Sequence, residues 1–181
     1  IEGWTFAQIR KVLNEHPAIE YKSAGLSDQQ ILQHIGASET AVEGIFFPDT
    51  YYFIKGSSDL DILQRAYKTM QNHLQNYWSE RVESLPLNTP YEALILASII
   101  EKETGAESDR AEIAGVFINR LRKGMKLQTD PTVIYGLGEQ FDGNLRKKDL
   151  LADQEYNTYT RAGLPPTPIS LPSLASIRAA L

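Results

Sequence analysis

The segment TPYEALILASII, residues 89–100, constrains the fold of this chain more than any other. Thr89, Pro90 and Glu92 form a strong helix start, because threonine caps a helix, proline suits its first turn and glutamate completes a capping box. After this start the segment is apolar around the whole helical circumference, except for Ser98. A helix without a polar face has to be surrounded by protein. The sequence therefore predicts a buried helix at the centre of a folded domain.

Two glutamates, Glu101 and Glu103, stand at the end of this helix, just before Thr104 and Gly105. They lie about 200° apart on a helical wheel, so only one of them can face a given cleft. The helix dipole and the apolar residues beneath both disfavour an ionised carboxylate, which suits a general acid. The alternative is that both glutamates are solvated at a frayed helix end. The apolar turn beneath them favours a carboxyl group that acts in chemistry.

The composition is that of a folded protein, with 42% hydrophobic and 23% charged residues in 181. This length allows one sizeable core or two small ones. A net charge of -5 and the lack of clustered basic residues exclude nucleic acid as a partner. There is no cysteine, and the three histidines lie far apart in the sequence, so disulfides, thiol chemistry and a structural zinc site are not expected.

No segment has the ~20 consecutive apolar residues that cross a bilayer. The chain opens on IEGWTF without an initiator methionine, as an excised fragment does. We therefore expect that any membrane anchor lies upstream.

The first half of the chain contains smaller elements. Capping patterns at Thr5 and Ser27 predict two short helices, the second ending at a left-handed Gly36. The aromatic and β-branched stretch 44–54 predicts two short extended pieces around a turn. Apolar residues at helical spacing predict a long helix over residues 58–84.

The second half continues with helices and loops. A helix is predicted over residues 108–123, with Gly124 as its stop, and shorter helices are predicted from Pro131 and near Ser173. The proline-rich segment 163–166 reads as a rigid loop and a candidate rim for a cleft.

Amides, hydroxyl groups and aromatic rings gather in this half of the chain, and such side chains suit sugars. The group comprises Asn119, Gln128, Thr129, Asp130, Asn157 and Tyr159. Two of them have a structural alternative, because Asp130 before Pro131 is typical of a helix N-cap and Asn157 of a residue that organises a turn.

Six motifs occur together and in order along the chain. They are EGIFFPDTY from position 43, ASIIEKET from 97, FINRL from 117, GMKLQTDPTVIYG from 124, YNTY from 156 and GLPP from 163. Together they resemble the endolytic murein transglycosylase family, also called YceG-like, over nearly the whole chain. The resemblance implies an α+β fold. A mainly helical, lysozyme- or transglycosylase-like catalytic domain would occupy residues 57–181, and a partial LysM-like subdomain with its connection residues 1–56.

The activity that this resemblance implies is cleavage of the β-1,4 bond between N-acetylmuramic acid and N-acetylglucosamine in nascent peptidoglycan. The reaction leaves a 1,6-anhydromuramoyl end, limits strand length and needs no metal or organic cofactor. The resemblance also implies an upstream anchor in the bacterial inner membrane, a catalytic part in the periplasm, and cell-wall synthases as partners besides the glycan strands.

The family's catalytic residue is the second glutamate of EKET, which is Glu103 here. We expect it to protonate the glycosidic oxygen and then, as a carboxylate, to remove the proton of the attacking C6 hydroxyl. The expected substrate-binding residues are Asn119, Gln128, Asn157, Tyr159 and Glu101, the last mainly supporting structure or orienting its neighbours.

Two other functions are compatible with the residues. A non-catalytic peptidoglycan-binding module of the cell-wall synthesis machinery would tolerate the loss of Glu103. A hydrolase that uses water would need a second acidic residue in the cleft, for which Glu101 and Asp130 are the nearest candidates.

Overall fold

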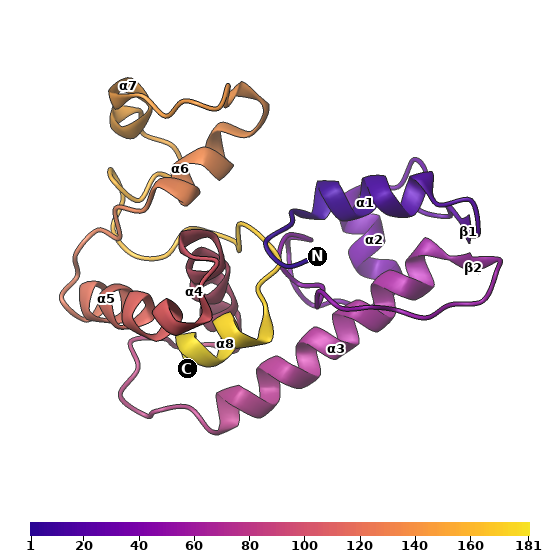
Figure 1. Ribbon diagram of the computed structural model, residues 1–181, viewed down its shortest axis with the longest axis horizontal. Coiled ribbons are helices and arrows are strands. Elements are labelled where there is room, and N and C mark those ends of the chain that lie inside the picture. The colour runs from indigo at the N-terminus through magenta and orange to yellow at the C-terminus, as the bar shows by residue number, and fades with distance from the viewer.

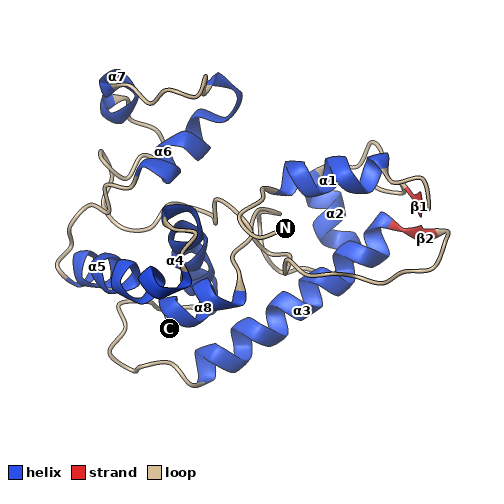
Figure 2. Cartoon of the chain, in the orientation of Figure 1, coloured by secondary structure: helices blue, strands red, loops and turns tan.

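A computed structural model describes all residues, 1–181, and it is mainly helical with one two-stranded sheet (Figures 1 and 2). This agrees with the predicted α+β class. The elements in chain order are α1 (Phe6–Glu15), β1 (Ile19–Glu20), α2 (Asp28–Ile35), β2 (Ser57–Ser58), α3 (Asp59–Ser79), α4 (Pro90–Glu103), η1 (Glu107–Asp109), α5 (Arg110–Arg122), α6 (Asp130–Leu137), η2 (Gly138–Gln140), α7 (Lys147–Leu151) and α8 (Leu174–Ala180).

Helix α4 is the central element, as its sequence predicts. All residues from 93 to 100 are buried, and the helix contacts α3, α5, α6 and α8. Its one polar member, Ser98, donates to the carbonyl of Ile95 at 2.7 Å and accepts from the amide of Ile169 at 3.0 Å. The C-terminal segment therefore covers α4 and also donates a hydrogen bond to the buried hydroxyl group of Ser98.

Helices α1 and α2 begin at the predicted caps. Thr5 and Ser27 each form a complete capping box, and Gly36 ends α2 with a φ of 73°. The two strands, β1 and β2, pair in parallel, with Ile19 opposite Ser57. In Figure 1 these elements form the right-hand part of the molecule, and α3 runs beneath both this part and α4.

The prediction of extended pieces in residues 44–54 is wrong, because no strand forms there. The segment buries Ile45 and Phe46 instead, half-buries Phe47, Tyr51 and Phe53, and leaves Tyr52 and Ile54 exposed. Phe46 is 1% exposed and stacks on Phe6 of α1, with 5.3 Å between ring centroids. The first part of this apolar stretch therefore packs into the core and not into a sheet.

Two element boundaries also differ from the predictions. Helix α3 ends at Ser79 instead of residue 84, and α5 begins at Arg110 after the short helix η1. Asp130 is the first residue of α6 rather than its cap, since Thr129 occupies the N-cap position.

The hydrophobic core is continuous. One cluster of buried side chains contains Phe6 and Ile31 from the first 56 residues and Met70, Leu94 and Ile177 from the remainder. None of the helices combines the length and the apolar character needed to cross a membrane.

Candidate active site

The two glutamates at the end of α4 point into different surroundings. The Glu101 side chain is 7% exposed, and one of its oxygens accepts hydrogen bonds from the Ser173 amide at 2.9 Å and hydroxyl at 2.6 Å. The same oxygen accepts from the Ser176 hydroxyl at 2.7 Å, and Arg110 lies 3.5 Å from the other oxygen. Glu101 thus joins α4 to the start of α8, and its carboxylate is fully engaged within the protein.

Glu103 is the last residue of α4, and it is exposed. The expectation that the apolar helix buries this carboxyl group is therefore wrong. The apolar part of α4 ends at Ile100, and the chain then projects Glu103 beyond the packed helices. Its one hydrogen-bond partner in the structure is the hydroxyl group of Thr129, which donates to Oε1.

Two other buried threonines hold Thr129 in place. The Thr129 amide donates to the Thr158 hydroxyl at 3.1 Å, and the Thr132 hydroxyl donates to the Thr129 carbonyl at 2.8 Å. The hydroxyl groups of Thr132 and Thr158 are 2.9 Å apart. This network joins the QTDPT and YNTY motifs, so two distant segments cooperate in positioning the donor to Glu103.

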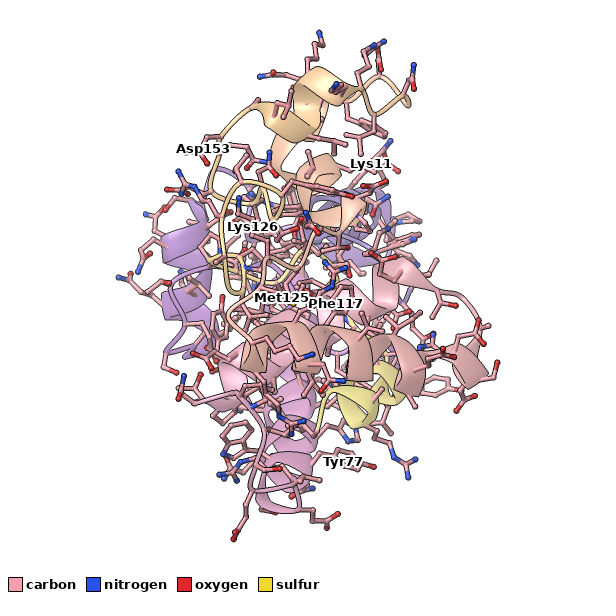
Figure 3. The ribbon with its side chains drawn as sticks, turned by 90° about the vertical axis from the view of Figure 1, so that its left-hand side faces the viewer. Lys11, Tyr77, Phe117, Met125, Lys126 and Asp153 are labelled. Carbon is pink, nitrogen blue, oxygen red and sulfur yellow. The ribbon has the colours of Figure 1, made fainter.

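A pocket of about 240 Å³ lies beside Glu103, between α5 and the loop that follows it, on the side shown in Figure 3. Its lining residues are Glu103, Ile113, Val116, Phe117, Arg120, Leu127 and Gln128. Arg120 donates to the side-chain oxygen of Gln128 at 3.0 Å and to the carbonyl of Leu127 at 3.0 Å. The pocket therefore combines a carboxyl group, a guanidinium, an amide and an apolar wall.

Gln128 has a φ of 53° and is the only residue other than glycine in the left-handed region. Its amide donates to the carbonyl of Thr158 at 3.1 Å, which together with Arg120 fixes this conformation. Sparsely populated backbone conformations of this kind concentrate at functional sites. Gln128 is thus held rigidly at the edge of the pocket.

Tyr159 and Asp130 form a second polar group near Glu103. The Tyr159 hydroxyl donates to Asp130 at 2.5 Å. Burial, this hydrogen bond and the charges of Asp130 and Glu103 raise the pKa of Tyr159 to about 12. The phenol is therefore a neutral donor at physiological pH, and it is close enough to Glu103 for the charge of that residue to act on it.

The other two predicted contact residues lie apart from this group. Asn119 is exposed on α5, with no side-chain hydrogen bond, and is not among the residues that line the pocket. Asn157 is fully buried, and its amide donates to the carbonyls of Ala152, Leu150 and Asp149 at 2.6, 3.1 and 3.3 Å. The structure thus gives Asn157 the alternative role that its sequence allowed, that of organising a turn.

Sequence reasoning missed the roles of Thr129 and Arg120. The sequence places Thr129 among the candidate sugar-binding side chains, but its position before Asp130 and Pro131 is also that of a helix N-cap, which brings a hydroxyl group to a helix end. Arg120 lies in the last turn of α5, where basic residues commonly interact with backbone carbonyls. Neither pattern reveals which distant group the side chain meets.

The end of the central buried helix thus presents one exposed carboxyl group near amide, phenol and guanidinium side chains, all of which can hydrogen-bond to a sugar. The chain belongs to the YceG-like family, whose model matches residues 1–181. The family resemblance of the six motifs is thereby confirmed.

Curated relatives and a solved structure agree with this family. The endolytic murein transglycosylase of Bacillus subtilis (strain 168) is 42% identical over 141 residues, which cover 77% of this chain and 38% of the relative. That of Streptococcus pneumoniae serotype 2 (strain D39 / NCTC 7466) is 32% identical over 145 residues, covering 77% and 26%. A crystal structure of a YceG-like protein from Listeria monocytogenes is 34% identical, with a TM-score of 0.79, and covers 99% of this chain and 64% of that one. The chain thus matches well under half the length of these curated relatives.

Proposed function

We propose that this chain forms the catalytic part of an endolytic peptidoglycan lytic transglycosylase, with Glu103 as its catalytic residue. The observation that carries the proposal is the contrast between the two glutamates of α4. Glu101 is buried in hydrogen bonds and an ion pair, whereas Glu103 is exposed beside a pocket and held by a single hydroxyl group. The names of the two curated relatives support the same reaction.

In the proposed reaction Glu103 donates its proton to the glycosidic oxygen while the bond from that oxygen to the anomeric carbon breaks. The resulting carboxylate removes the proton from the C6 hydroxyl of the same sugar. The C6 oxygen then bonds to the anomeric carbon, which closes a 1,6-anhydro ring without consuming water. The attack gains from proximity, because nucleophile and electrophile belong to one sugar.

The exposure of Glu103 fits this scheme if the substrate itself covers the carboxyl group. A glycan lying over the end of α4 would replace the surrounding water, and a less polar environment favours the neutral acid. The Thr129 hydroxyl would keep the carboxyl group oriented while the proton leaves and returns. We assign direct glycan contacts to Gln128 and Tyr159, retain Asn119 as a peripheral contact, and give Asn157 and Glu101 the task of shaping the site.

One observation keeps hydrolysis as a second candidate reaction. Asp130 is an exposed carboxylate whose charge, together with that of Glu103, acts on Tyr159. A hydrolase needs a second carboxylate to activate water or to form a glycosyl intermediate. Glu101 is turned away from the surface, so Asp130 is the candidate for that role.

Product analysis separates the two reactions. The full-length, membrane-anchored protein is incubated with uncrosslinked peptidoglycan strands, and the products are identified by mass spectrometry. We expect anhydromuramoyl ends from the wild type, none from Glu103→Gln, and wild-type amounts from the control Glu107→Gln, another exposed glutamate. Reducing ends that require Asp130 would establish hydrolysis instead. Strand binding without any cleavage would leave a non-catalytic binding module.

The remaining features of the full protein belong to the same proposal. Residues 1–56 would be part of a LysM-like unit, supported by two capped helices and a small sheet, with residues 57–181 as the catalytic domain. The protein would be held in the bacterial inner membrane by an upstream anchor, with its catalytic part in the periplasm where peptidoglycan lies. Cell-wall synthases would be its protein partners. Cell fractionation and crosslinking of the full-length protein test the location and the partners.

A further inference from the structure

A second and larger hollow, of about 850 Å³, lies between α1 and α6. In Figure 1, α6 lies in the left-hand part of the molecule and α1 in the right-hand part. Its lining includes Lys102 and Pro131, which are direct neighbours of Glu103 and Asp130 in the chain. Neighbouring Cα atoms are 3.8 Å apart, so the backbone that lines the hollow is continuous with the backbone that carries Glu103. Its volume falls within the range of about 300–1,000 Å³ that is typical of ligand sites.

Glu43 is the buried acidic residue of this hollow, with 8% of its surface exposed. One oxygen accepts from the amide of Phe6 at 3.0 Å, and the other accepts from the hydroxyl group of Tyr135 at 3.1 Å. A carboxylate can accept about four hydrogen bonds, so these two contacts leave capacity for donors that enter the hollow. Burial raises the pKa of Glu43 to about 7, because removing the ionised carboxylate from water costs free energy. A purely structural link between α1 and α6 does not require this cost.

Aromatic and basic groups complete the wall. Tyr135 and Tyr156 meet edge to face, with 4.9 Å between their ring centroids, and both line the hollow. Lys102 is exposed, and its ammonium group is 3.3 Å from the carbonyl of Gly3. An acceptor for hydroxyl or amide groups, aromatic surface for a sugar ring and a cation for a carboxylate together suit an N-acetylated amino sugar that carries an acidic peptide.

We propose that the Glu43 hollow binds a sugar unit of the same glycan strand that crosses Glu103, with Glu43 accepting its donors and Lys102 pairing with a carboxylate of the peptide that the sugar carries. This rests on the proposed function, because it requires a glycan at Glu103. The strand would run along the end of α4, from the pocket at Arg120 and Gln128 past Glu103 to the hollow. Glu43 would then fix how far the strand extends beyond the bond that is cut.

Binding to an inactive full-length protein tests this proposal. Glu103→Gln serves as the parent, so that bound strands stay intact, and the probe is uncrosslinked peptidoglycan strands of defined length. Adding Glu43→Gln should weaken strand binding about tenfold, as expected when a hydrogen bond to a buried charged group is lost. Adding Ala7→Trp, at an exposed residue of α1 that lines the hollow, should weaken binding at least as much by filling the space. The control Ala111→Trp, exposed on α5 outside the hollow, should leave binding unchanged.

Ala7→Trp decides the matter if Glu43→Gln impairs folding, because it leaves Glu43 and its hydrogen bonds in place. Strand binding within twofold of the parent for Ala7→Trp would overturn the proposal, and so would a parent that does not bind strands. Failure of the proposed function has a different result: the wild type would make no anhydro ends while Ala7→Trp still weakened binding.

Discussion

The hydroxyl group of Thr129 donates a hydrogen bond to Oε1 of Glu103, across 26 positions of sequence. An exposed glutamate at a helix end ordinarily samples several rotamers, and a catalytic carboxyl group has to be held close to one geometry. The threonine is itself fixed through its backbone by Thr158 and Thr132. The network therefore restricts the rotamers of the exposed Glu103 side chain, and Thr129 is a positioning residue.

Replacing Thr129 with valine tests this role. Thr129→Val keeps the shape of the side chain and its backbone hydrogen bonds but removes the donor. We expect kcat for strand cleavage to fall by about tenfold or more, with KM nearly unchanged, because the variant loses orientation of Glu103 and not glycan binding. The measurement is steady-state formation of anhydro ends by the full-length protein.

Thr129→Ser is the matched control, because it restores the hydroxyl group. It should recover most of the lost kcat. A merely structural role predicts the opposite order, since serine leaves a small cavity at a residue that is 3% exposed and valine does not. Equal kcat for wild type and Thr129→Val would show that Glu103 needs no such support.

Glu101 should matter for stability rather than for chemistry. Glu101→Gln leaves Arg110, whose side chain is 9% exposed, without its charge partner. Breaking a buried ion pair in this way typically costs about 3–5 kcal/mol. We expect a loss of this order in the free energy of unfolding, measured by urea denaturation, while the folded fraction retains cleavage activity. Glu112→Gln, at an exposed residue of α5, should change stability by less than about 0.5 kcal/mol. A stable but inactive Glu101→Gln would contradict this assignment.

The contrast between the two glutamates also shows what the sequence can predict. The apolar run in α4 predicts a central helix, and the helical wheel predicts that Glu101 and Glu103 face different ways, because both arguments depend only on local geometry. Which glutamate is buried depends on Ser173 and Ser176, which are more than seventy positions away. Local patterns carry no information about such partners. The motifs identify Glu103 only through the family that they resemble.

The same distinction explains the error in residues 44–54. Aromatic and β-branched residues favour strands, but here they have no neighbouring strand to pair with. Ile45 and Phe46 pack into the core, with Phe46 against α1, whereas Tyr52 and Ile54 are exposed. Asp130 is a milder case. Its position before a proline suits a cap, but α6 begins one residue earlier, at Asp130 itself. The carboxylate of Asp130 instead accepts a hydrogen bond from the Tyr159 hydroxyl. In both cases tertiary contacts override a local preference.

Gly44 and Gly25 provide a matched test of close packing. Both have a positive φ, of 75° and 74° respectively, so alanine is strained equally at either position. A Cβ atom on Gly44 would collide with Pro168 and lie 2.9 Å from the carbonyl of Ser170, whereas nothing lies within 4 Å of a Cβ atom on Gly25. We expect Gly25→Ala to cost about 1–2 kcal/mol and Gly44→Ala about 1–3 kcal/mol more, by urea denaturation. Equal losses would mean that the segment after α7 shifts freely away from Gly44.

Glu43 should make the protein less stable as the pH rises toward neutrality. Burial raises the pKa of its carboxyl group from 4.5 to about 7, and the charge of Asp28 acts in the same direction. Hydrogen bonds from Phe6 and Tyr135 oppose the shift without cancelling it. Below pH 4.5 the carboxyl group is neutral in the folded and the unfolded state, so burial carries no ionic cost. Between pH 4.5 and 7 the folded state binds more protons, and the free energy of unfolding falls as pH rises.

The fall attributable to Glu43 should reach about 3 kcal/mol above pH 7, since each pKa unit corresponds to about 1.4 kcal/mol. Glu43→Gln has no proton to lose and should lack this slope. The measurement is urea denaturation of both proteins at several pH values from 4 to 8. The difference between them removes the effect of the other groups that titrate in this pH range. A difference that does not vary with pH would mean that the carboxylate of Glu43 is solvated in the folded protein, and that the hollow offers a glycan an exposed rather than a buried acceptor.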